Sequence, residues 1–138
     1  MRQLSLALLL ALWAGIAAAA EVVARIDLSE QRMDVARNGK HLYTWPVSTA
    51  RAGKVTPVGT FTPDFLSPNH RSTIYNGAPM PWSIFFHGNY AIHGTNQVQY
   101  LGRPASAGCI RLHPDHARRL YEMVKAAGLA NTRIVVTR

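Results

Sequence analysis

The chain has 138 residues, 48% of them hydrophobic, and carries 15 Lys and Arg against 7 Asp and Glu, a net charge of +8. This length fits one domain with a substantial core and is too short for two. The basic residues are scattered, without a Lys/Arg-rich helix face or zinc-finger spacing, so the composition argues against nucleic acid as a partner. The single cysteine excludes an intramolecular disulfide.

Residues 1–20 have the pattern of a secretory signal peptide. Met1-Arg2 is short and positively charged, residues 4–14 are apolar, and three alanines supply a cleavage site before Glu21. We therefore expect an exported protein of the periplasm or cell wall whose mature domain is residues 21–138. An uncleaved N-terminal anchor is the alternative. Without Arg2, 14 of the 15 basic residues remain against 7 acidic ones, and the resulting positive charge suits an acidic wall polymer or an anionic membrane surface.

The first part of the mature chain predicts an antiparallel meander of three strands. Residues 22–27 and 32–37 alternate apolar and polar side chains, which is typical of half-buried strands. Asn38-Gly39 predicts a two-residue turn with positive φ angles, which leads into a third strand at residues 40–47. A further turn at residues 56–59 then precedes a short strand at residues 60–62.

The middle of the chain is predicted to form one long loop followed by one hairpin. Residues 66–81 are rich in Pro, Asn, Ser and Gly, so we expect a long irregular segment there, and loops of this length are usually functional or mobile. Residues 82–86 and 90–93 are expected to pair as two strands across the turn His87-Gly88-Asn89.

One substantial helix is predicted in the C-terminal half. His113 precedes Pro114, a favoured first helical residue, and apolar side chains recur at helical spacing up to Ala127. Gly128 is a natural residue to follow the helix end. A β-branched run at residues 133–137 predicts a last strand, so the fold class is mainly β with one helix.

The chemistry concentrates between His93 and Cys109. Cys109 lies in the run Ser106-Ala107-Gly108-Cys109-Ile110-Arg111-Leu112, where small residues allow a tight turn and Arg111 adds a positive charge that favours thiolate. A thiol needs a base within hydrogen-bond reach to become a nucleophile, and His93 at a predicted strand end supplies one. The residues alone leave the alternative open that Cys109 is an inert buried side chain.

At these residues the sequence resembles the L,D-transpeptidase catalytic domain, or YkuD, family. The resemblance rests on Ile92-His93-Gly94-Thr95, a spacer, and the run from Ser106 to Leu112, and it extends upstream through the segment Thr56-Pro57-Val58-Gly59-Thr60-Phe61. It covers essentially the whole mature chain. The family fold that it implies is a β-sandwich bearing a helix.

The resemblance also implies a mechanism. Cys109 would attack the carbonyl of the L-configured centre of the diamino acid in a peptidoglycan stem tetrapeptide, releasing D-alanine and leaving a thioester. His93 would act as base and then as acid, and the Gly94 carbonyl would orient its imidazole. Backbone amides of Gly108 and Cys109 would hold the oxyanion.

The remaining site residues have supporting roles in this scheme. Ser106 is expected to support the turn, and Arg111 either braces the loop through backbone carbonyls, which we favour, or contacts a substrate carboxylate. Tyr75, Met80 and Trp82 are candidates to line the substrate cleft. The family commonly has His where this chain has Ala107, so a second imidazole beside the site is absent.

No cofactor and no metal are expected. His113 and His116 have a spacing that can bind metal, as can the set His87, His93 and Cys109, but helix capping and the catalytic role explain these residues more simply. Peptidoglycan is the expected partner, no nucleic acid is expected, and nothing in the sequence indicates more than a monomer.

Several alternatives stay open from the sequence. The acyl acceptor is a diamino-acid amine, water, a free D-amino acid or a lysine of an outer-membrane protein. A sortase-like cysteine transpeptidase is disfavoured because sortases separate their His and Cys much further. A non-catalytic wall-binding module is favoured only by Ala107.

Overall fold

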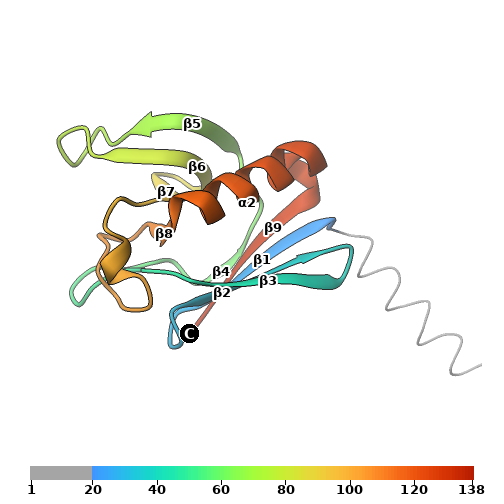
Figure 1. The fold of residues 1–138 in the computed structure, drawn as a ribbon, viewed down its shortest axis with the longest axis horizontal. Helices are drawn as coiled ribbons and strands as arrows, with labels where there is room; N and C mark the ends of the chain where they lie inside the picture. Colours follow the sequence, from blue (N-terminus) through green and yellow to red (C-terminus); the bar gives the residue numbers. More distant parts are fainter. Residues whose placement is uncertain (1–19) are drawn as a thin grey trace, which may run out of the picture.

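Two β-sheets and one long helix make up the domain, as Figure 1 shows. The structure is a computed structural model that describes residues 20–138. The mainly β class with a helix in the C-terminal half is confirmed. Of the predicted signal peptide, residues 1–19 lie outside the described residues. Within residues 20–138, no helix has the length and apolar character needed to cross a membrane.

The first sheet has five strands in the order β3-β2-β1-β9-β4. Their bounds are Val22–Asp27 (β1), Arg32–Arg37 (β2), Lys40–Pro46 (β3), Gly59–Phe61 (β4) and Thr132–Thr137 (β9). The predicted antiparallel meander of β1 to β3 is confirmed, and its turn has φ angles of 50° at Asn38 and 77° at Gly39. The C-terminal strand β9 enters the middle of the sheet, parallel to β1 and antiparallel to β4.

The second sheet has four strands in the order β5-β6-β7-β8. Their bounds are Phe65–Arg71 (β5), Pro79–His87 (β6), Tyr90–Gly94 (β7) and Ile110–Leu112 (β8). The prediction that residues 66–81 are irregular is therefore wrong, because most of them form β5 and the start of β6. The prolines are tolerated because β5 is an edge strand and β6 pairs with β7 only from Ile84 onward, so a missing N–H breaks no central ladder.

The helix α2, Pro114–Ala127, begins and ends as predicted. The Asp115 amide donates a hydrogen bond to His113 Nδ1 at 3.1 Å, Pro114 occupies the first turn, and Gly128 follows the helix with φ of 98°. Two short 3₁₀ helices, η1 (Val98–Tyr100) and η2 (Leu129–Asn131), complete the structure.

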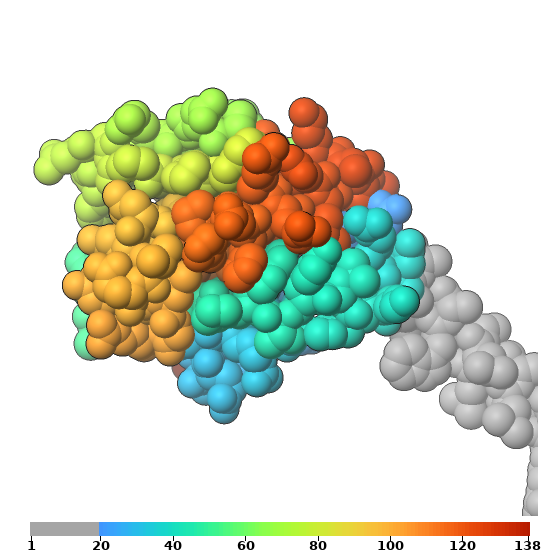
Figure 2. Space-filling view, in the orientation of Figure 1, coloured from blue at the N-terminus to red at the C-terminus, as the bar shows by residue number. Residues whose placement is uncertain are grey.

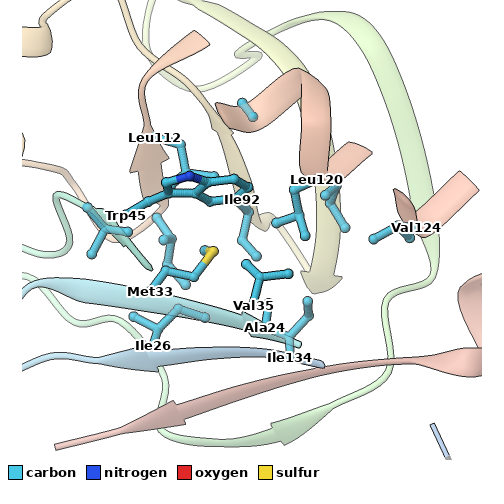
Figure 3. Packing of buried hydrophobic residues seen from close by; sticks show 14 of the residues in the cluster. Ala24, Ile26, Met33, Val35, Trp45, Ile92, Leu112, Leu120, Val124 and Ile134 are labelled. Carbon is cyan, nitrogen blue, oxygen red and sulfur yellow. The ribbon is translucent and has the colours of Figure 1, made fainter. Parts of the chain in front are cut away.

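The core lies where α2 and the inner faces of both sheets meet, and Figure 3 shows its packing. Met33, Ile92 and Leu120, one residue from each of the two sheets and the helix, are completely buried. In Figures 1 and 2 the helix runs between the β5–β6 hairpin and strand β3. Because α2 covers one face of the second sheet, the opposite face is left to other side chains, and this opposite face carries the candidate site.

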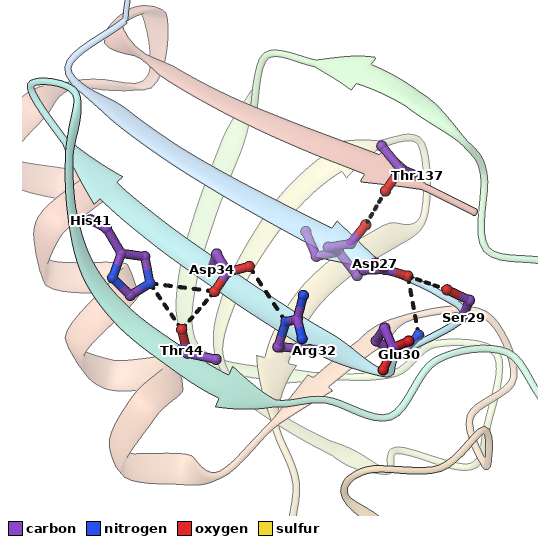
Figure 4. A network of polar contacts seen from close by, with 9 residues as sticks. Asp27, Ser29, Glu30, Arg32, Asp34, His41, Thr44 and Thr137 are labelled. Atoms are coloured by element: carbon purple, nitrogen blue, oxygen red, sulfur yellow. Dashed lines mark hydrogen bonds and ion pairs between the residues drawn. The ribbon is translucent and has the colours of Figure 1, made fainter.

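Polar contacts on the outer face of β1 to β3 lie away from that site (Figure 4). Thr44 donates to an Asp34 oxygen at 2.6 Å, and this hydrogen bond is the main reason why the pKa of Asp34 lies below its usual value. The ion pair of Asp34 with Arg32 is solvent-exposed, and such pairs contribute little to stability. The buried core, rather than this network, therefore holds the two sheets together.

Candidate active site

Strand pairing brings the predicted nucleophile and base to one face of the second sheet. Strands β7 and β8 run parallel, and His93 lies opposite Arg111. Cys109 precedes Arg111 by two residues, and side chains two apart along an extended chain point to the same side. His93, Cys109 and Arg111 accordingly line one cavity of about 390 Å³.

Most of the sequence-predicted site residues meet at this cavity. Its lining consists of Ser72, Tyr75, Ala78, Pro79, Met80, His93, Thr95, Asn96, Gln97, Ser106, Ala107, Cys109 and Arg111. Tyr75, on the turn between β5 and β6, is half exposed, whereas Met80 is buried and packs with Phe85 beside Cys109.

Trp82, predicted as a cleft residue, lies on the other face of the sheet. Its ring makes an edge contact with Tyr121 of α2 at a centroid distance of 5.3 Å, and the Arg118 guanidinium lies over it at 5.4 Å. Trp82 has a φ of 57°, a left-handed conformation that side chains other than Gly adopt at a cost. This local reversal accounts for Trp82 packing on the helix while Met80, two residues earlier, packs on the site face.

His93 is held in one orientation and one tautomer. Its Nδ1 atom lies 2.7 Å from the Gly94 carbonyl oxygen, the contact expected from the sequence, and a carbonyl only accepts, so Nδ1 carries the proton. Nε2 is thereby left as an acceptor. Burial of the ring, with smaller effects from Arg111 and His70, lowers the pKa of His93 to about 4. The imidazole is therefore neutral at physiological pH and able to accept a proton.

Cys109 is a protonated thiol in the resting site. Burial raises the pKa of the Cys109 thiol, and this outweighs the Ala91 amide and the positive charge of Arg111, which act in the opposite direction. The sulfur lies 3.7 Å from the Asn89 carbonyl oxygen, to which the thiol donates. The arrangement fits general-base catalysis, in which the thiol loses its proton during attack, rather than a preformed ion pair.

The turn before Cys109 is fixed by Ser106 and requires glycine at position 108. Ser106 Oγ donates to the Cys109 carbonyl at 2.6 Å and accepts from the Gly108 amide at 3.0 Å. Gly108 has φ of 137°, and a Cβ atom there would lie 2.7 Å from the Tyr90 ring and 2.8 Å from the Val55 carbonyl oxygen. The Gly108 amide, predicted as an oxyanion donor, is thus already engaged with Ser106, which leaves the Cys109 amide as the other predicted donor.

Thr56 is a site residue to which sequence reasoning assigned no role. Its hydroxyl is buried and donates to the Gly108 carbonyl oxygen at 2.8 Å, across 52 positions of the chain. The available signal was the Thr-Pro-Val-Gly segment that helped to carry the family resemblance. Nothing in the local sequence connects this segment to the cysteine turn, because the contact forms only when the chain folds.

Arg111 brings the one formal charge to the cavity lining. Its Nη1 atom donates to the Gln97 side chain at 3.2 Å, so the loop contact in the structure is with a side chain rather than with the backbone carbonyls that we favoured. Burial lowers the pKa of Arg111, although the group stays charged. None of the ion pairs among residues 20–138 includes this guanidinium.

A second cavity adjoins the first at the cysteine. It measures about 370 Å³ and is lined by Ile74, Tyr75, His87, Gly88, Asn89, Tyr90, Ala107 and Cys109. Tyr75, Ala107 and Cys109 belong to both cavities. The thiol therefore borders two spaces, and the small side chain of Ala107 lies at the junction between them.

The histidines considered as metal ligands have other contacts. His113 caps α2, and His116 stacks on Trp45 with ring centroids 4.8 Å apart. His87 lies against Phe61 and Tyr90. Across residues 20–138, no three or more His, Cys, Asp or Glu side chains gather closely enough to hold a metal ion.

Comparisons with known proteins agree on one family. A sequence model of the L,D-transpeptidase catalytic domain (YkuD) matches residues 21–136. A Bacillus subtilis protein named as a candidate L,D-transpeptidase, YkuD, is 25% identical over 115 residues, which cover 82% of this chain and 64% of the relative. Another, YqjB, is 28% identical over 106 residues, which cover 67% of this chain and 58% of the relative. The chain spans less than two thirds of the length of these relatives.

Solved L,D-transpeptidase structures share the fold. An L,D-transpeptidase from Mycobacterium smegmatis has a TM-score of 0.76 and 27% identity, and the match covers 86% of this chain and 59% of that one. The L,D-transpeptidase LdtMt1, solved in complex with imipenem, also has a TM-score of 0.76, at 21% identity over 85% of this chain and 59% of its own.

Replacing His93 with Gln is expected to slow alkylation of Cys109 by iodoacetamide at pH 7 by at least about tenfold, because a thiol with a raised pKa depends on a base. The rate is followed by intact-protein mass. His41→Gln, at an exposed histidine of β3, serves as the control and is expected to react like the wild type. An unchanged rate in His93→Gln would contradict a role as base.

Acidification is expected to destabilise the fold through His93. The pKa of His93 is about 4 in the folded protein, below the ordinary value of 6.5, so the unfolded chain binds this proton first. The free energy of unfolding should therefore fall as the pH drops from about 6.5 towards 4. The free energy of unfolding, measured by urea titration at several pH values in this range, should depend less steeply on pH in His93→Gln than in the wild type. An equal pH dependence of the free energy of unfolding in the two proteins would mean that burial does not hold the imidazole neutral.

Proposed function

Because the chain belongs to the family of L,D-transpeptidase catalytic domains, we propose that it is a cysteine-dependent acyltransferase acting on peptidoglycan stem tetrapeptides. The single observation that carries this proposal is the cavity that His93 and Cys109 line together, with the tautomer of His93 fixed by the Gly94 carbonyl. Membership of this family also argues against the sortase-like cysteine transpeptidase that the sequence left as an alternative.

In the first half-reaction, the Cys109 sulfur attacks the carbonyl carbon of the L-configured centre of the diamino acid. His93 Nε2 takes the thiol proton, and a tetrahedral oxyanion forms on the carbonyl oxygen. The carbon–nitrogen bond to D-alanine then breaks, the imidazolium returns the proton to the leaving amine, and a thioester remains on Cys109. The Cys109 amide is the backbone donor for the oxyanion.

In the second half-reaction, an acceptor attacks the thioester. An amine gives a new amide, and water gives the free acid. His93 takes a proton from the acceptor and passes it to the departing thiolate, which restores the starting site. The acceptor is the diamino-acid amine of another stem peptide, water, a D-amino acid or a protein lysine.

The two cavities that share Cys109 suit a transfer reaction between two substrates. The cavity with His93 and Arg111 is the larger of the two and carries the base, and the second cavity shares Tyr75, Ala107 and Cys109 with it. A donor peptide in one cavity and an acceptor in the other would both reach the same sulfur atom. We assign the donor to the cavity with Arg111, because its unpaired positive charge suits the carboxylates of a stem peptide.

We place this activity outside the cytoplasm, in the periplasm or cell wall, with peptidoglycan as the partner and the monomer as the working form. The pattern of residues 1–20 and the positive charge of the mature domain support this placement.

The purified protein, incubated with disaccharide tetrapeptide, is expected to release D-alanine, and Cys109→Ala is expected to abolish the release because no nucleophile remains. The D-alanine is quantified by an enzyme-coupled assay. A faster readout is the mass of the intact protein after incubation with imipenem, which should rise in the wild type and not in Cys109→Ala. If the wild type shows neither turnover nor acylation, the non-catalytic wall-binding module replaces this proposal.

Replacing Arg111 with Gln is expected to lower kcat/KM for the tetrapeptide by at least about tenfold, because a charge-assisted contact with a carboxylate is lost. The informative comparison uses the same peptide with its terminal carboxylate blocked as an amide. If Arg111 binds that carboxylate, wild type and Arg111→Gln should process the amide at similar rates. An equal decrease of kcat/KM on both peptides would instead mean that Arg111 acts by holding the loop that carries Gln97.

A further inference from the structure

The peptide unit between Gly108 and Cys109 is held from one side by a side chain distant in sequence. Thr56 is 5% exposed, and its hydroxyl donates to the Gly108 carbonyl oxygen at 2.8 Å. The same oxygen of Thr56 accepts a hydrogen bond from the Ala50 amide at 3.0 Å. Because the Thr56 hydroxyl is held by both hydrogen bonds, it fixes the direction in which the Gly108 carbonyl points.

The direction of this carbonyl determines the direction of the Cys109 amide. A trans peptide is planar, and its C=O and N–H bonds point in opposite directions. No cis peptide bond occurs among the described residues. Since the Gly108 carbonyl points at Thr56, the Cys109 N–H points away from Thr56.

The two sides of this peptide face different spaces. Thr56 lines a cavity of about 520 Å³ together with Val55 and Lys54, whereas Cys109 lines the two cavities of the candidate active site. The carbonyl end of the peptide is thus turned to the Thr56 side of the turn. Its N–H end is turned to the opposite side, where the thiol reacts.

The neighbouring amide is unavailable for the same task. The Gly108 N–H donates to Ser106 Oγ at 3.0 Å. Ser106 Oγ also donates to the Cys109 carbonyl, so the turn is tied on both sides of the cysteine. Of the two amides predicted to hold the oxyanion, the Cys109 N–H is the one that can turn towards it.

We propose that Thr56 is a positioning residue that directs the Cys109 N–H at the oxyanion of the acyl-transfer reaction. This inference rests on the proposed function, because only acyl transfer produces the oxyanion. Donation from the Thr56 hydroxyl also polarises the peptide, since hydrogen bonds in a chain strengthen one another, and the N–H becomes a better donor. Thr56 itself lines neither of the two cavities that Cys109 lines.

Thr56 could instead serve only to stabilise the fold. Two reactions of Cys109 distinguish this structural role from the proposed role in directing the Cys109 amide. Acylation by imipenem passes through a tetrahedral oxyanion and needs the donor. Alkylation by iodoacetamide displaces iodide at a saturated carbon and forms no oxyanion. A variant that misdirects the amide slows only the first reaction, whereas a variant that disturbs the thiol or the fold slows both.

The experiment measures both rates by intact-protein mass for the wild type, Thr56→Val and Thr56→Ser. We expect Thr56→Val to acylate about 10- to 100-fold more slowly, as small displacements of catalytic groups do, and to alkylate within about twofold of the wild type. Thr56→Ser keeps the hydroxyl and should recover most of the acylation rate. If Thr56→Val does not fold, Thr56→Ala removes the hydroxyl with less bulk and gives the same comparison.

The matched control is Thr132→Val. Thr132 is completely buried, and its hydroxyl donates to the Gly128 carbonyl at 3.1 Å, at the start of β9. Thr132→Val removes a comparable hydrogen bond and should change neither the acylation rate nor the alkylation rate.

Two results would overturn the role of Thr56: an acylation rate that is unchanged in Thr56→Val, or acylation and alkylation rates that fall together. A wild type that is alkylated but shows neither imipenem acylation nor D-alanine release from the tetrapeptide would instead overturn the proposed function, and the role of Thr56 with it.

Discussion

The parallel pairing of β8 with β7 is the constraint on which the site depends. It sets His93 opposite Arg111, and the alternation of side chains along an extended chain then brings Cys109 to the same face. This face is available because α2 packs on the other one, where Ile92 joins the core. The helix, the core and the sheet register therefore act together to place a thiol and an imidazole, sixteen positions apart in sequence, in one cavity.

Burial gives this pair its chemical character. It lowers the pKa of His93 and raises that of Cys109, so both groups rest in their neutral forms. In the proposed reaction, charge develops only when the thiol attacks. The two groups that we propose to stabilise this charge are the Cys109 amide on the turn and the guanidinium of Arg111, which lines the same cavity as Cys109. A site of this kind holds little electrostatic strain at rest and depends on the precise direction of its donors.

The parts of the structure that were predicted are those governed by local rules. The meander β1 to β3 follows from alternation and an Asn-Gly turn, and α2 follows from helical periodicity with Pro114 at its start. Residues 66–81 were misread because Pro, Asn and Gly indicate a loop locally, whereas an edge strand tolerates them. Trp82 was misplaced for a related reason, since its positive φ reverses the side on which it lies and no sequence pattern shows this.

The sequence by itself determined the family and the mainly β class, and it predicted Cys109 as nucleophile and His93 as base, because these inferences depend on residue types at fixed spacings. Only the tertiary structure decided how the site is held. It placed Thr56 on the Gly108 carbonyl and engaged the Gly108 amide with Ser106. It also paired Arg111 with Gln97 and divided the space around Cys109 into two cavities. These contacts join segments up to 52 positions apart, and such distant segments meet only when both sheets close on their shared core.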